Sequence, residues 1–260
     1  MTRLAANLTM LFTDLPFLDR FAAAAAAGFK AVECVSPYGE PAETVAERMR
    51  AAGLTFALFN MPPGDWAAGD RGYAANPARA EEFRASIETA LTYARATSCK
   101  TLHLMAGKIP VDADRAAWTA TLIANIRLAA DAVAGDGITL VLEPINTRVD
   151  IPGYFYDRSA AVMDIIEQVG RDNVQLLFDI YHLQVMEGDL ARSIERLLPK
   201  IGHIQLADNP GRHEPGSGEI NFGWLLPRID ALGYEGWVGC EYAPATTTTE
   251  GLGWARPYLG

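Results

Sequence analysis

Cysteine and histidine are scarce in this sequence of 260 residues, which has three cysteines and four histidines. The cysteines, Cys34, Cys99 and Cys240, are widely spaced and form no C-x-x-C pair. An odd number at such spacing excludes the disulfide framework of a small secreted domain. Asp14 and Pro16 interrupt the apolar N-terminal stretch, which makes it a poor signal peptide. We therefore expect reduced thiols and a cytoplasmic location.

Basic residues are also in the minority, because 22 Lys and Arg stand against 32 Asp and Glu, for a formal net charge of −10. Binding to nucleic acid or to an anionic membrane surface requires clustered Lys and Arg, so neither partner is expected. No apolar run approaches the roughly 20 residues that a membrane-spanning helix needs. The expected partner is a small molecule, and any anionic group on it must meet a few local cations.

Short apolar, β-branched runs alternate regularly with longer segments of helical periodicity along the whole sequence. Eight runs are predicted to be strands: 4–8, 31–36, 55–61, 101–106, 139–145, 174–180, 202–207 and 237–242. Eight strand and helix units in about 250 residues predict an α/β fold, a (β/α)8 TIM barrel, with residues 1–260 as a single catalytic domain. No G-x-G-x-x-G follows the first strand and no linker divides the chain, which disfavours a dinucleotide-binding fold.

Glycines and loop residues mark the ends of the predicted elements. Five predicted helices end in a glycine before the next strand, as is typical of a closing residue in left-handed conformation: Gly28, Gly53, Gly137, Gly170 and Gly233. Segment 207–219 is predicted to be a functional loop after the seventh strand. The threonine run at 246–249 is predicted to be a loop after the eighth.

Four successive predicted strands carry a polar side chain near the carboxyl end, where barrel enzymes place their chemistry. These residues are Glu143, Asp179, Gln205 and Glu241, at spacings of 36, 26 and 36 residues. Each spacing is close to one strand and helix unit, so the four groups should lie side by side around the barrel mouth. Unpaired buried carboxylates are costly, and a cation should meet them.

The chemistry of this set predicts which cation it would hold. Three carboxylates and an amide oxygen are hard ligands, which favour one Mg2+ or Mn2+ ion over Zn2+. In the alternative interpretation, Glu143 and Glu241 pair with arginines, and Asp179 caps the helix that follows it.

The segments that contain these residues are LEPIN at 142–146, DIYH at 179–182, HIQLADNPGRHEPGSGEINF at 203–222 and CEY at 240–242. Together they resemble the hydroxypyruvate isomerase family, one of the xylose-isomerase-like barrels. The resemblance implies that Glu143 and Glu241 act as acid/base carboxylates and metal ligands, with Asp179 and Gln205 completing the metal site. Related epimerases usually have a histidine where this chain has Gln205, a departure that the hydroxypyruvate isomerase branch shares.

The resemblance implies an isomerase that interconverts hydroxypyruvate and tartronate semialdehyde by metal-assisted proton transfer through an enediolate. The alternative within this chemistry is a 2-oxo-tetronate isomerase. Gln205 disfavours a ketose 3-epimerase, and the acidic composition with few histidines disfavours an apurinic endonuclease with several zinc ions. A further alternative is a non-catalytic barrel that binds sugar acids, and the sequence does not exclude it. Paired barrels are common in this family, so a homo-oligomer is compatible with the resemblance.

Several further residues are predicted to bind the substrate. Arg212, on the loop beyond Gln205, is the first candidate for the substrate carboxylate, and Lys108 is the second. His182 matches a substrate-side histidine of the family, and His103 could face the mouth from the fourth strand. The alternatives are solvated cations and structural, buried histidines.

Three other features have a structural and a functional interpretation. Because side chains alternate along a strand, His203 and Gln205 should share a face, with His203 in a structural role. Glu33 is expected to form a salt bridge inside the barrel or to support the metal ligands. Segment 59–66 is predicted either to close over the substrate or to be an exposed loop anchored by Trp66.

Overall fold

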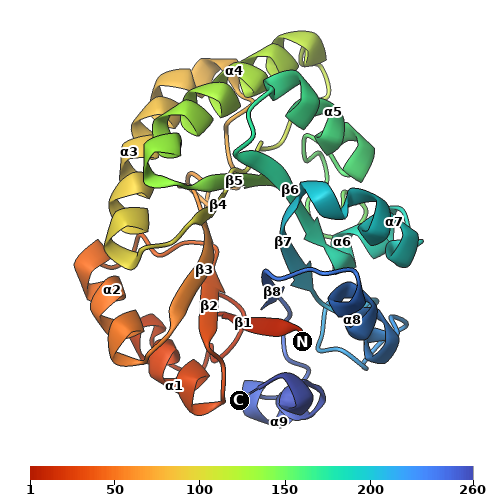
Figure 1. Ribbon diagram of the computed structural model, residues 1–260. Helices are drawn as coiled ribbons and strands as arrows, with labels where there is room; N and C mark the ends of the chain where they lie inside the picture. Colours follow the sequence, from red (N-terminus) through yellow and green to blue (C-terminus); the bar gives the residue numbers. More distant parts are fainter. Residues whose placement is uncertain (260) are drawn as a thin grey trace.

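The structure is a computed structural model that describes residues 1–259 of the chain. Parallel strands form a closed barrel in chain order, in which β8 pairs with β1 (Figure 1). The strands are β1 (Arg3–Asn7), β2 (Ala31–Cys34), β3 (Thr55–Asn60), β4 (Thr101–His103), β5 (Thr139–Leu142), β6 (Val174–Asp179), β7 (Ile201–Leu206) and β8 (Trp237–Cys240). The predicted (β/α)8 barrel is confirmed.

Helices join the strands and surround the barrel (Figure 1). The α-helices are α1 (Arg20–Ala26), α2 (Ala42–Ala51), α3 (Ala80–Thr97), α4 (Arg115–Val133), α5 (Ser159–Val169), α6 (Ile180–Met186), α7 (Leu190–Leu197), α8 (Phe222–Ala231) and α9 (Thr248–Gly251). Short 3-10 helices are η1 (Phe17–Asp19), η2 (Pro77–Arg79), η3 (Ala134–Asp136), η4 (Leu198–Lys200) and η5 (Leu252–Tyr258). In Figure 1, α9 lies between α8 and α1 at the closing edge of the helical ring.

Burial on both faces explains why the strands read as nearly continuous apolar runs. All four residues of β2 are buried, and the same holds for the last four of β3 and of β7. This pattern is typical of parallel strands that are covered by helices outside and by packed side chains inside. Within the barrel, Leu58, Val141 and Leu177 form a cluster separate from the main core.

The observed elements differ from the sequence prediction mainly at the strand ends. The predicted strand 101–106 stops at His103. The backbone N–H of Leu104 still donates to the carbonyl oxygen of Val141 in β5, but Ala106 forms only an isolated bridge with Gly72. The predicted strand 174–180 ends at Asp179, whose side chain starts α6 at Ile180. The threonine run is not wholly a loop, since Thr247 caps α9.

The five predicted closing glycines all adopt positive φ, between 60° and 100°. Segment 207–219 lies in the long loop between β7 and α8, as predicted. In the described residues, no helix combines the length and the apolar character needed to cross a membrane.

Candidate active site

Polar side chains from the ends of β5 to β8 meet beside a cavity of about 270 Å3 at the barrel mouth. Glu143 and Glu241 line this cavity directly after β5 and β8. Asp179 is the last residue of β6 and lies opposite Gln205 of β7 in the strand register. All four residues are buried. The structure therefore brings the predicted set together at neighbouring strand ends.

Several oxygens of this cluster, which could act as metal ligands, have no hydrogen-bond partner in the part of the chain that the structure describes. Three buried oxygens have no hydrogen-bond partner: Oε1 of Glu143, Oδ2 of Asp179 and Oε1 of Gln205. Ligand atoms of Glu143, Asp179 and His182 also lie within 4.8 Å of one another, a group that could hold a metal ion. Because unpartnered buried oxygens are costly, these atoms suit an oxygen-preferring cation.

Asp179 fits both of its predicted roles, as the cap of a helix and as a possible metal ligand. Its Oδ1 accepts hydrogen bonds from the backbone N–H groups of Tyr181, at 2.7 Å, and His182, at 3.1 Å, which caps α6. Its Oδ2 is the oxygen without a partner. One carboxylate therefore starts a helix with one oxygen and leaves the other available.

Arg212 neutralises part of the acidic cluster. Its Nη2 lies 3.0 Å from Oε2 of Glu241 and 3.8 Å from Oδ2 of Asp179, and its Nη1 lies 3.0 Å from Oδ1 of Asp150. The alternative interpretation of Glu241 as the partner of an arginine thus holds in this structure. Burial lowers the pKa of Arg212, but Glu241 and the neighbouring acids raise it further, so the guanidinium stays charged.

Burial raises the pKa of the acids in this cluster, because it disfavours their charged form. It raises the pKa of Glu143 well above its ordinary value, and the charges of Glu241 and Asp179 add to this shift. Burial raises the pKa of Glu241 to about 8 and of Asp179 to about 6, although Arg212 opposes both shifts. Carboxyl groups with a pKa near neutrality can both take up and return a proton.

The two histidines beside Glu143 are neutral. Burial lowers the pKa of His103 to about 3, and burial together with Arg212 lowers that of His182 well below its ordinary value. Their distances to Glu143, 3.5 Å from His103 Nδ1 and 3.4 Å from His182 Nε2, are therefore contacts of neutral imidazoles.

Asn146 determines which nitrogen of His182 carries the proton. Its Oδ1 accepts from the backbone N–H groups of Val149 and Asp150, so its amide nitrogen must face the other way. That nitrogen lies 2.7 Å from His182 Nδ1, which must accept because an amide N–H only donates. His182 therefore presents Nε2–H toward Glu143, 3.4 Å from Oε1 and without a hydrogen bond to it, so Nε2 has a proton to donate and no lone pair for a metal ion.

Glu33 orders the polar groups inside the barrel. Its carboxylate accepts from Asn7 Nδ2 at 2.9 Å and from Gln205 Nε2 at 2.8 Å, and lies 2.7 Å from His203 Nε2. Any side chain at Gly239 would collide with this carboxylate, so the glycine makes room for it. Because Glu33 engages the amide nitrogen of Gln205, the amide oxygen is the end left free.

Lys108 is the one predicted site residue that lies apart from the cluster. Its side chain is exposed, its backbone bridges Tyr154, and it does not line the cavity. The sequence interpretation in turn missed Asp150 and Arg71, which do line the cavity. Both lie on loops between predicted elements, where periodicity carries no signal.

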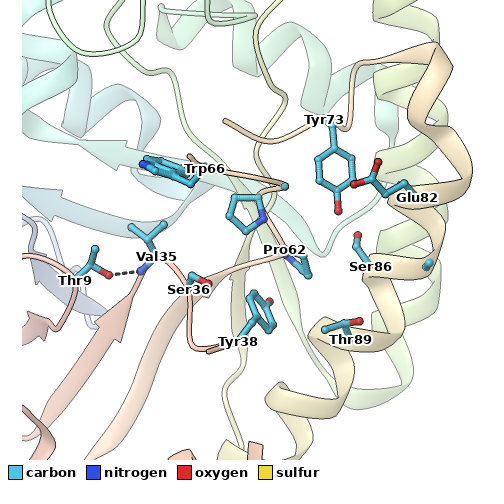
Figure 2. A pocket seen from close by; sticks show the side chains of 13 residues that line it. Thr9, Val35, Ser36, Tyr38, Pro62, Trp66, Tyr73, Glu82, Ser86 and Thr89 are labelled. Atoms are coloured by element: carbon cyan, nitrogen blue, oxygen red, sulfur yellow. Dashed lines mark hydrogen bonds between the residues drawn. The ribbon is translucent and has the colours of Figure 1, made fainter. Parts of the chain in front are cut away.

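A second cavity of about 610 Å3 adjoins the first. Thr9, Val35 and Trp66 line both. In Figure 2, Trp66 and Val35 lie on one side of the larger cavity, and Tyr73, Ser86 and Thr89 lie on the other. It contains none of the buried, unpartnered oxygens, so the smaller cavity is the candidate active site.

Fold and site together define a barrel enzyme with an acidic centre at the carboxyl ends of its strands. The family model of xylose isomerase-like TIM barrels matches residues 21–258. A 2-oxo-tetronate isomerase of Cupriavidus necator is 52% identical over 260 residues, 100% of both chains. The hydroxypyruvate isomerase of Escherichia coli is 45% identical over 258 residues, 99% of this chain and 100% of that one.

A solved structure described as an AP endonuclease of family 2 from Brucella melitensis has a TM-score of 0.97 and 47% identity, with 100% of each chain covered. The chain belongs to the xylose isomerase-like TIM barrel family. These matches confirm the predicted family and the prediction of an isomerase.

Proposed function

We propose that this chain isomerises a small hydroxy-oxo acid by moving a proton between adjacent carbons. The proposed substrate and product are hydroxypyruvate and tartronate semialdehyde, in either direction. The alternative substrate, 2-oxo-tetronate, is supported by the relative that shares 52% identity. The observation that carries the proposal is the pair of buried glutamates, Glu143 and Glu241, beside unpartnered oxygens and a neutral donor histidine. We also propose that residues 1–260 act as one catalytic domain.

The residues at the mouth fit one Mg2+ or Mn2+ ion. Glu143, Asp179 and Gln205 each offer an oxygen without a partner, and Glu241 would complete the set once the cation replaces part of its pairing with Arg212. Oxygen ligands of this kind are preferred by hard cations. Such an ion would supply Lewis-acid stabilisation of the negative charge that develops on the substrate oxygens.

Glu143 and Glu241 are the proposed proton-transfer residues. A carboxylate removes a proton from one carbon, and the same or the other carboxylate returns it to the neighbouring carbon. Burial raises the pKa of both groups, to about 8 for Glu241, which makes each a stronger base than an exposed glutamate.

The remaining predicted residues orient the substrate. His182 donates from Nε2 to a substrate oxygen, and buried His103 supports Glu143 from the adjacent strand. Arg212 is already paired with Glu241 and Asp150, so we assign it to charge balance and to a substrate oxygen near the reacting carbons. Lys108 lies outside the cavity, and its geometry gives no support for contact with the substrate.

An endonuclease activity has less support, although one similar structure is described in that way. The net charge of −10 opposes binding to a phosphate backbone. Zinc binds an imidazole nitrogen through its lone pair. In His182, Nδ1 accepts from Asn146 and Nε2 carries the proton, so neither nitrogen is available to zinc. The three buried free cysteines support a location in the reducing cytoplasm.

Proton NMR in D2O tests the proposal. Protein loaded with Mg2+ or Mn2+ is incubated with hydroxypyruvate and, separately, with 2-oxo-tetronate, and compared with Glu143→Gln and Glu241→Gln. We expect product with deuterium at the exchanging carbon, and a loss of roughly 100-fold or more in each variant. Glu81→Gln, at an exposed position of α3, is the matched control and should behave as wild type. Absence of isomerisation and exchange with both acids under either metal would rule the proposal out.

A further inference from the structure

Arg71 differs in its surroundings from Arg212, the other arginine that lines the site cavity. Arg212 lies 3.0 Å from carboxylates of both Asp150 and Glu241. Arg71 forms no ion pair with any carboxylate among residues 1–259, and its contacts are with backbone carbonyls and an indole ring. Its positive charge is therefore the one at this cavity that no acid neutralises.

The guanidinium of Arg71 also keeps one complete edge free. Its Nη1 donates to the carbonyl oxygens of Trp66, at 3.2 Å, and Asp70, at 2.5 Å. Within the described residues, Nε and Nη2 donate no hydrogen bond to the protein. The Nε–H and one Nη2–H point in the same direction and form a fork that matches the two oxygens of a carboxylate.

The loop after β3 holds this arginine in place. The Arg71 guanidinium stacks 3.8 Å from the centre of the Trp66 ring, which Figure 2 shows beside Val35. The Asp70 carboxylate does not compete for Arg71, because it accepts from Arg79 at 2.7 Å and from the backbone of Asp65 at 2.8 Å.

Gly72 then anchors the loop against the end of β4. It has a φ of +85°, and a side chain there would collide with Met105. Met105 itself lines the site cavity, so this contact ties the segment that carries Arg71 to the cavity wall.

We propose that Arg71 is the binding subsite for the carboxylate of the substrate, through bidentate hydrogen bonds from Nε and Nη2. This inference rests on the proposed function and restricts its substrates to small acids whose carboxylate lies next to the reacting carbonyl. An anion entering this cavity meets Glu143, Asp150 and Glu241 elsewhere on the wall, and Arg71 is the cation free to receive it. The opposite end of the substrate then lies toward the acidic cluster.

The test uses Arg71→Met, which removes the charge, and Arg71→Lys, which keeps the charge but loses the fork. Arg84→Met is the control, since Arg84 lies exposed on α3 and pairs with Glu81. Steady-state kinetics with hydroxypyruvate should show KM raised roughly 10- to 100-fold in Arg71→Met, a smaller rise in Arg71→Lys, and little change in kcat. Arg84→Met should match wild type.

Calorimetry on the metal-loaded protein separates this inference from the isomerase assignment. Glycolate is a hydroxy acid with no aldehyde or ketone to isomerise, and it should bind at least tenfold more weakly to Arg71→Met than to wild type. Uncharged glycolamide should bind equally to wild type and to Arg71→Met. Unchanged glycolate binding in Arg71→Met, or an equal loss for glycolamide, overturns the subsite. If wild type binds glycolate through Arg71 but turns over neither acid, the subsite stands and the proposed reaction fails.

Discussion

The side-chain amide of Gln205 has a donating and an accepting end, and Glu33 selects which end stays available. The carboxylate of Glu33 can only accept, so it holds the amide nitrogen of Gln205 at 2.8 Å and leaves Oε1 without a partner. A neutral amide is a weaker metal ligand than an ionised carboxylate, and its orientation therefore matters more. Glu33 is in this respect a positioning residue for the proposed metal site.

Glu33→Gln should weaken metal binding. A glutamine at position 33 offers one oxygen instead of two, so Gln205 can turn its nitrogen toward the cavity, where it would repel a cation. We expect the Kd for Mn2+, measured by calorimetry without substrate, to rise roughly 10- to 100-fold. Glu47→Gln, at an exposed position of α2, is the control. An unchanged Kd would show that Glu33 does not orient the ligand.

At the scale of elements, the loop between β7 and α8 is organised by one buried carboxylate. Asp208 accepts hydrogen bonds from four backbone N–H groups at 2.8–3.0 Å, those of Asn209, Gly216, Gly218 and Ile220. Its own backbone N–H donates to His213, which closes the turn that presents Arg212 at a φ of +56°. A long loop is thus held in one conformation without regular secondary structure.

Asp208→Asn should loosen this loop, because an amide replaces one accepting oxygen with a group that cannot accept. We expect a loss of about 2–3 kcal/mol in the free energy of unfolding, measured with urea, and lower activity as Arg212 loses its position. The control is Asp189→Asn, an exposed residue before α7. Wild-type stability together with wild-type kcat in Asp208→Asn would contradict this account of the loop.

For the whole molecule, we expect the acidic centre to make stability depend on pH and on the proposed metal ion. Without metal, burial raises the pKa of Glu241 to about 8 and that of Glu143 well above its ordinary value. The folded chain then binds more protons than the unfolded chain, so this stabilisation is complete at low pH and is lost as the pH rises through the raised pKa. Near pH 7 and above, His103 and His182 are mainly neutral in both states and contribute little to the slope.

We therefore expect the Tm of metal-free protein to fall between pH 7 and 9, and saturating Mg2+ to remove most of that fall by replacing the protons. Thermal unfolding in EDTA and in MgCl2 measures both curves. Glu241→Gln removes one titrating group and should flatten the metal-free curve. Identical pH slopes with and without metal would exclude the link between this centre and a cation.

The order of elements followed from the sequence alone, because hydrophobic periodicity and closing glycines are local properties. The eight strands, the barrel and the positions of Glu143, Asp179, Gln205 and Glu241 at neighbouring strand ends needed only spacing and the resemblance of their segments to a family. Strand ends were predicted less well. Buried residues just beyond a strand, such as Leu104 and Ala106, have the same apolar character as strand residues, although β4 itself ends at His103.

Only the tertiary structure decided which groups the site residues contact. It paired Arg212 with Asp150 and Glu241, bound Gln205 to Glu33 across 172 residues of sequence, and set the tautomer of His182 through Asn146. It also placed Arg71 in the cavity and Lys108 outside it. Such contacts join loops and strands far apart in the chain, and their strength depends on burial and hydrogen-bond geometry, which no local pattern of residues encodes.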